Sequence, residues 1–170
     1  YGLAGIGLGV LFLAVMLVNI VSTGWTAFLQ TYIQIEVTFT PELVDPSGAR
    51  TEDALRQGDY FTLARDALKQ TFPEVTGRSE RRQLNALISV GAEHQLRNMV
   101  IAVPSLIGTT QQVWVLASDD VDMFWKGYID RDLPEEQRRV PDAQIAMIDT
   151  LESRDAIKQE FNWAFFTNAD

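Results

Sequence analysis

The chain has 170 residues, of which 14 are lysine or arginine and 23 are aspartate or glutamate, so its formal net charge is −9. None of these charges occurs before Glu36, and the first basic residue is Arg50. At the chain average, a segment of that length would hold about eight charges. An apolar leader joined to an acidic remainder excludes a simple cytosolic enzyme. The acidity also disfavours nucleic acid as a partner, because its phosphates would be repelled.

The leader contains an apolar run over residues 3–21, in which Asn19 is the one strongly polar side chain. A helix of this length spans about 28 Å, close to the thickness of a bilayer core. The run is apolar on every face, whereas a soluble core helix is usually amphipathic. No good cleavage site follows it, which favours an uncleaved anchor over a signal peptide. We predict a transmembrane helix over residues 1–24 and one extracytoplasmic domain over residues 25–170.

Small and aromatic residues mark the two ends of this helix. Gly5 and Gly9 are spaced to lie on one face, where a second membrane helix could approach closely. Trp25, Phe28 and Tyr32 follow the run. Such residues suit the membrane–water interface, or they are core residues of the next element; the sequence leaves both readings open.

The side of the membrane follows from the missing basic residues. Cytoplasmic flanks of membrane helices are enriched in Lys and Arg, yet none occurs between the apolar run and Arg50. We therefore expect the inner membrane, with the domain on the periplasmic side, and a basic flank that precedes Tyr1 in the parent protein. The absence of cysteine is compatible with this location.

The acidic part predicts an α+β domain that is mostly helical. Alternating apolar residues predict a strand over 31–39, and a second, buried strand is expected over 111–117. The last aromatic segment, 161–167, is either a strand or a return towards the membrane. Five helices are expected. The first covers residues 59–71. The second is capped by Ser79 and carries Leu84, Leu87 and Ile88. The other three lie around Leu96–Val100, from Ser118 to Trp125, and at 141–153.

Residues able to carry chemistry are few. His94 is the one histidine and there is no cysteine, so a His/Cys zinc site is excluded. Asp119, Asp120 and Asp122 could hold a cation, but the N-terminus of a helix capped by Ser118 explains them better. We predict no catalytic residue, no metal and no cofactor.

Arg78, Arg81 and Arg82 lie three and four residues apart, on one face at the start of a predicted helix. Such a group could hold an anion or contact an acidic partner. An ordinary solvated charged face is the default interpretation, and the nearby Glu74 and Glu80 keep the local field from being strongly positive. These arginines are the candidate contact residues of the domain.

Three segments, 26–39, 113–134 and 161–167, resemble the amino-terminal extension of some phosphate ABC transporter permeases of the PstA type. That extension is catalogued as a domain of unknown function (DUF3333). The resemblance implies an inner-membrane subunit of a phosphate importer. Its partners would be a second permease subunit, a periplasmic phosphate-binding protein and an ATPase dimer. The permease core, with its further membrane helices, is absent from these 170 residues, so transport residues cannot be assigned.

The expected role is that of a membrane anchor and periplasmic accessory domain in phosphate transport, without enzymatic activity. It would contact the binding protein or the partner permease. The alternative is a membrane-anchored periplasmic domain that senses a ligand. An anchored hydrolase would need a catalytic group that the sequence does not offer.

Overall fold

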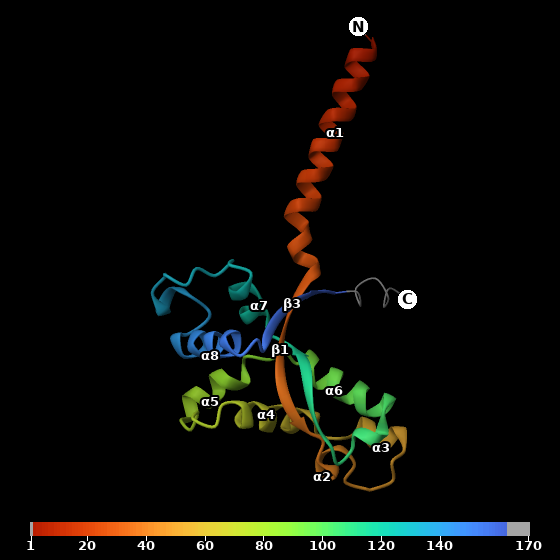
Figure 1. The fold of residues 1–170 in the computed structure, drawn as a ribbon, viewed down its shortest axis with the longest axis vertical. Coiled ribbons are helices and arrows are strands. Elements are labelled where there is room, and N and C mark those ends of the chain that lie inside the picture. Colours follow the sequence, from red (N-terminus) through yellow and green to blue (C-terminus); the bar gives the residue numbers. More distant parts are fainter. Residues whose placement is uncertain (1, 163–170) are drawn as a thin grey trace. The chain divides into compact units, whose positions relative to one another are not determined.

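A computed structural model describes residues 2–162, and the chain in it divides into two units. One compact unit is Thr31–Gln159; the other joins residues up to Gln30 with those from Glu160 onward. The elements of the described residues, labelled in Figure 1, are α1 (Gly2–Gly24), η1 (Trp25–Phe28), β1 (Leu29–Thr38), α2 (Pro41–Val44), α3 (Glu52–Arg56), α4 (Tyr60–Thr71), α5 (Arg78–Asn85), α6 (Gly91–Ala102), η2 (Pro104–Leu106), β2 (Thr110–Leu116), α7 (Asp119–Trp125), η3 (Glu135–Gln137), α8 (Asp142–Ser153) and β3 (Ile157–Phe161). The fold class is α+β and mostly helical, as predicted.

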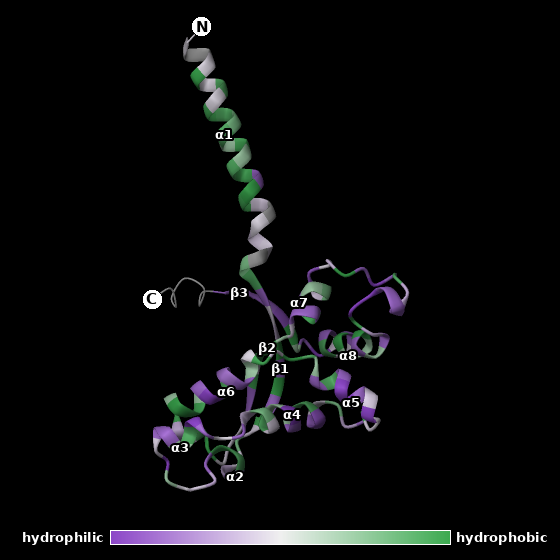
Figure 2. Cartoon of the chain, turned by 180° about the vertical axis from the view of Figure 1, so that it is seen from behind, coloured by the Kyte–Doolittle hydropathy of each residue, from purple (hydrophilic) through white to green (hydrophobic). Residues whose placement is uncertain are grey.

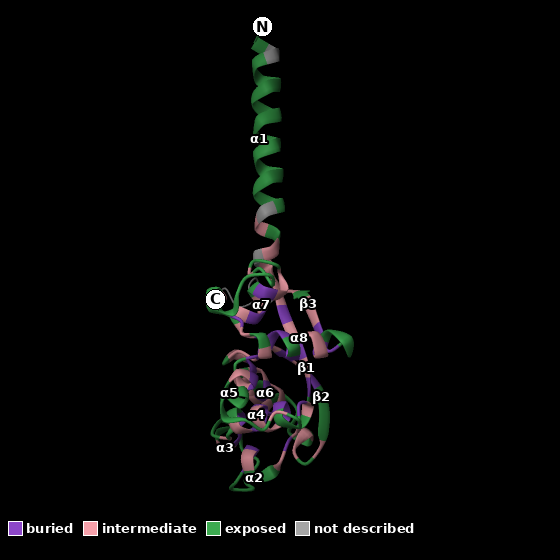
Figure 3. Cartoon of the chain, turned by 90° about the vertical axis from the view of Figure 1, so that its left-hand side faces the viewer, coloured by how far each residue is buried: buried purple, intermediate pink, exposed green. Residues whose placement is uncertain are grey.

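Helix α1 is predominantly apolar and almost entirely exposed. Its window Gly5–Ser22 has a mean hydropathy of 2.3 and contains no charged residue. Figure 2 shows hydrophobic colour around the helix, and Figure 3 shows that it is exposed along most of its length. Among the described residues it is the one helix long and apolar enough to cross a bilayer. Membrane anchors and signal sequences share these properties.

The sheet has three strands in the order β2-β1-β3. Strand β1 forms because β-branched and aromatic residues alternate with polar ones, so that one face is apolar. Ile33, Ile35 and Val37 are buried, while Glu36 between them is exposed. β2 pairs antiparallel with β1, with Ile33 opposite Val115.

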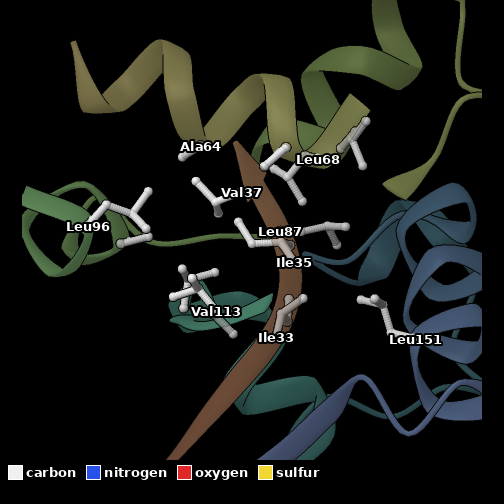
Figure 4. Packing of buried hydrophobic residues seen from close by; sticks show 14 of the residues in the cluster. Ile33, Ile35, Val37, Ala64, Leu68, Leu87, Leu96, Val113 and Leu151 are labelled. Carbon is white, nitrogen blue, oxygen red and sulfur yellow. The ribbon is translucent and has the colours of Figure 1, made fainter. Parts of the chain in front are cut away.

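Helices of the compact unit pack against one another and against the sheet. α4 contacts α2, α5 and α6; α6 also contacts α3 and β2, and α5 contacts α8. Apolar side chains from separate elements pack around the buried residues of β1. This packing removes their apolar surface from water, which stabilises the fold. Figure 4 shows this core, with labels on Ile33, Ile35, Val37, Ala64, Leu68, Leu87, Leu96, Val113 and Leu151.

Three sequence-based expectations need correction. The helix expected to run through Leu87 and Ile88 ends at Asn85, because Ile88 instead bridges to Ala117 beside the end of β2. Ser79 is not its cap; Gly77 occupies that position. β2 is also not buried on both sides.

In β2, Val113 and Val115 are buried, whereas Trp114 and Leu116 on the opposite face are half-buried and the first residues of the strand, including Gln111 and Gln112, are exposed. β3 begins at Ile157, before the segment 161–167, for which the sequence left a strand and a return towards the membrane both open; residues 163–167 lie outside the described residues.

Candidate functional site

A pocket of about 790 Å³ collects the three arginines predicted from the sequence and adds a fourth. Its lining residues come from α4, from the connection after it and from α5, and we name it the arginine pocket. They are Arg65, Thr76, Arg78, Ser79, Arg81, Arg82 and Asn85. The helical spacing of α5 therefore does bring Arg78, Arg81 and Arg82 to one concave surface.

Sequence reasoning missed Arg65, which lies on α4 and reaches the pocket only through the packing of α4 against α5. Periodicity predicts which residues share a face of one helix, but it cannot predict which second helix will lie beside that face. The one local signal was Phe61, four residues earlier. The Arg65 guanidinium lies over its ring, 5.2 Å from the centroid, which restrains the side chain.

Buried contacts hold α5 in place beneath its arginines. Leu84 is fully buried in the core. On α8, the buried Gln144 donates a hydrogen bond from Nε2 to the Gln83 carbonyl, at 2.8 Å. Arg81 Nε donates a long bond of 3.5 Å to the Val75 carbonyl. The pocket wall is thus fixed to the core, although the α5 arginines are exposed and Arg65 is half-buried.

The electrostatics of this pocket differ from those of the surrounding surface. Ion pairs to nearby carboxylates hold Arg56, Lys69, Arg97, Lys126, Arg131, Arg138 and Arg139. Within residues 2–162, no carboxylate forms such a pair with Arg65, Arg78, Arg81 or Arg82. A concentration of positive charge therefore persists on an acidic protein.

The two glutamates that could have neutralised this site lie elsewhere. Glu74 and Glu80 line a different hollow, of about 260 Å³, together with Ala143 and Met147 of α8. Guanidinium groups offer paired donors that match carboxylate or phosphate oxygens. The chemistry available in the arginine pocket is thus anion binding.

A second arrangement joins the two segments of the smaller unit. The Phe161 ring lies 5.1 Å from that of Trp25 and 5.9 Å from that of Phe28, centroid to centroid. The amide of Asn162 donates a 2.7 Å hydrogen bond to the Phe28 carbonyl. We name these four residues the aromatic junction. It brings the end of β3 beside η1, which directly follows α1.

Residues 1–135 match the family model described as a domain of unknown function, DUF3333. The chain belongs to the DUF3333 family. Every residue of the arginine pocket lies within the matched range, whereas α8, β3 and Phe161 lie beyond it. No curated protein and no solved structure matches the chain significantly.

The acidic cluster of this DUF3333 chain has a structural explanation. Asp122 Oδ1 accepts bonds from the amide of Thr31 (2.9 Å) and from its hydroxyl (2.7 Å), and Oδ2 pairs with Lys126 at 2.6 Å. Asp120 lies 3.7 Å from Arg139. Among the described residues, no three His, Cys, Asp or Glu side chains are placed to hold a metal ion. Ser118 occupies the N-cap position of α7, but its hydroxyl forms no capping bond.

The other predicted residues of the DUF3333 chain are exposed. His94 lies on the surface of α6, where its Nδ1 is 3.2 Å from Arg97 Nη1. Gly5 and Gly9 have open space around the position of a Cβ atom in the described chain. A Cβ atom added at either position would contact no other segment of the described residues.

Proposed function

We propose that this chain is the membrane anchor and periplasmic accessory domain of an inner-membrane phosphate ABC importer permease of the PstA type. The aromatic junction is the observation that carries the proposal. In it the end of β3 lies beside η1, which directly follows α1, as expected for a domain inserted between two membrane segments. Membership of the DUF3333 family and the resemblance of segments 26–39 and 113–134 supply the rest of the support.

In this proposal α1 crosses the bilayer, and Trp25 and Phe28 lie at the interface, where aromatic rings with one apolar side are favoured. Trp25 is half exposed, at 51%, which suits a lipid headgroup contact. The lack of Lys and Arg up to Arg50 supports a periplasmic location for the compact unit.

The proposed role of the domain is contact with other proteins, not catalysis. The importer supplies the partners: a second permease subunit, a periplasmic phosphate-binding protein and, through the permease core, an ATPase dimer. The compact unit would contact the binding protein or the second permease. The arginine pocket provides it with a recognition surface that differs from the acidic remainder.

A domain replacement tests the proposal. Because Asn162 bonds to Phe28, a short Gly-Ser linker can replace residues 31–159 of the full-length protein without separating the flanking segments. We expect the protein to remain in the membrane while phosphate uptake at low external concentration falls and the second permease or the binding protein no longer co-purifies. Unchanged uptake and unchanged partners would contradict an accessory role.

The parent gene provides an independent check. A permease requires several further apolar helices after this segment. One further helix followed by a cytoplasmic signalling helix would instead indicate a ligand-sensing receptor, in which case the replacement would leave phosphate uptake intact.

A further inference from the structure

We infer that the arginine pocket binds an acidic segment of a partner protein, with two or more carboxylates paired to Arg65, Arg78, Arg81 and Arg82. The inference rests on the proposed role in protein contact and adds to it the chemistry of the partner. It concerns one surface of the compact unit, formed by α4 and α5.

Most basic residues outside this surface form ion pairs with carboxylates. Carboxylates outnumber basic residues by 23 to 14, yet four arginines gather without an ion pair among the described residues. Like charges three and four residues apart on a helix repel one another, which is the relation of Arg78 to Arg81 and Arg82. An anion in the pocket would relieve this repulsion. The described carboxylates therefore do not neutralise the positive charge of this pocket.

Arg65 is held in position at the edge of the pocket. It is half-buried, and its guanidinium lies over the Phe61 ring, 5.2 Å from the centroid. Part of the cost of ordering this side chain is thus already met before a ligand arrives.

The size and exposure of the pocket favour a chain with several carboxylates over a single small ion. A volume of about 790 Å³ far exceeds that of one oxyanion, and the α5 arginines are exposed, so one ion would contact a few guanidinium groups and stay hydrated. An extended acidic segment can reach several of them at once. Thr76, Ser79 and Asn85 add hydroxyl and amide groups that can bond to the backbone of such a segment.

Nucleic acid is a poor alternative occupant. It would bring many phosphates against the rest of a protein whose net charge is −9. A short acidic segment confines its charge to the pocket, where screening over about 8 Å at physiological salt weakens repulsion from the other carboxylates. Docking should therefore be specific to this surface.

The test uses the whole chain in a non-ionic detergent and fluorescein-labelled hexaglutamate as the probe, followed by fluorescence polarisation. We expect saturable binding that weakens with salt, and no binding of labelled hexaglutamine. The triple variant Arg78→Gln, Arg81→Gln, Arg82→Gln should bind at least about tenfold more weakly. The matched control is Arg56→Gln, Arg131→Gln, Arg139→Gln, which changes the net charge equally and should stay within about twofold of the native affinity.

A lysine triple at positions 78, 81 and 82 guards against loss of fold. It keeps the charge without the planar fork, so we expect affinity between the native and glutamine forms. Equal weakening in the pocket and control triples would overturn the inference, because binding would then report net charge alone. So would displacement of the probe by inorganic phosphate at concentrations below those of hexaglutamate itself, which would identify a small-oxyanion site. None of these results depends on transport, so failure here leaves the replacement experiment on phosphate uptake interpretable.

Discussion

At the scale of single residues, two aspartates organise the start of the compact unit. The buried Asp45 accepts bonds from the Arg50 amide and the Ser47 hydroxyl, both at 2.8 Å, and so closes a loop in which Arg50 has a φ of 52°. These donors, the Arg50 amide foremost, lower the pKa of Asp45 against the opposing effect of burial. Asp59 caps α4 and its pKa is lowered by the Thr62 amide and then by the Thr62 hydroxyl.

These lowered pKa values predict acid sensitivity. A carboxyl whose pKa is lower in the folded state stabilises the fold above its ordinary value of 3.8, and that stability disappears as the pH falls through the lowered folded value. We expect urea unfolding, followed by near-ultraviolet circular dichroism, to need progressively less denaturant below about pH 4. The double variant Asp45→Asn, Asp59→Asn should show a shallower dependence on pH. An unchanged slope in the double variant would contradict this role.

Asp122 is predicted to be a structural link, not a cation ligand. Its carboxylate satisfies both the amide and the hydroxyl of Thr31, whose exposure is 1%. Asp122→Ala leaves these groups without a partner and should lower the free energy of unfolding by about 1–3 kcal/mol. Asp119→Ala, in the same turn but exposed, is the matched control and should have a smaller effect. Denaturant unfolding measures both; equal losses would show that general acidity of the turn, and not the Thr31 link, matters.

At the scale of elements, the spacing of apolar residues along the sequence predicted most of the helices and strands. β1, α4, α6, α7 and α8 occur where alternating or helical spacing indicated them. The short helices α2 and α3 were missed because Pro41, Pro46 and Gly48 indicate a loop, and each helix lasts about one turn. The end of α5 was wrong because the Ile88 bridge to Ala117 is a long-range contact that no local window contains.

The sequence also predicted one part of the candidate site and missed another part that depends on long-range packing. Spacing along α5 was enough to predict the shared face of Arg78, Arg81 and Arg82. Sequence proximity also suggested that Glu74 and Glu80 would neutralise that face, but both line another hollow. The tertiary packing of α4, α5 and α8 decides which charges meet, and this packing is absent from a one-dimensional pattern.

The two faces of helix α1 are expected to respond differently to larger side chains. Gly5 and Gly9 lie four residues apart and share a face, whereas Gly7 lies nearly opposite. In the full-length protein, Gly5→Leu with Gly9→Leu should reduce co-purification of the proposed second permease subunit, because larger side chains keep a second helix away. Gly7→Leu is the matched control and should have little effect. Since the space around all three glycines is open in the described chain, the chain itself should tolerate each change. Equal effects from Gly7→Leu would contradict the proposed packing face.

At the scale of the molecule, the core lies wholly within the compact unit. The buried apolar residues run from Ile33 to Ile157, inside Thr31–Gln159. We therefore expect residues 31–159, expressed alone, to be monomeric without detergent, while the full chain requires detergent because α1 is exposed. Size-exclusion chromatography with light scattering checks this. Aggregation of the short form would show that its surface also needs membrane partners.

The central claim is that α1 anchors a domain lying outside the cytoplasm, and site-directed labelling tests it most directly. The chain contains no cysteine, and Ser105 in η2 is exposed, so Ser105→Cys gives one reporter within this segment at little structural cost. In cells that produce the full-length protein, with the outer barrier opened but the inner membrane intact, a membrane-impermeant maleimide should label this cysteine fully. Labelling that occurs only after the inner membrane is disrupted would place the domain in the cytoplasm and contradict the claim.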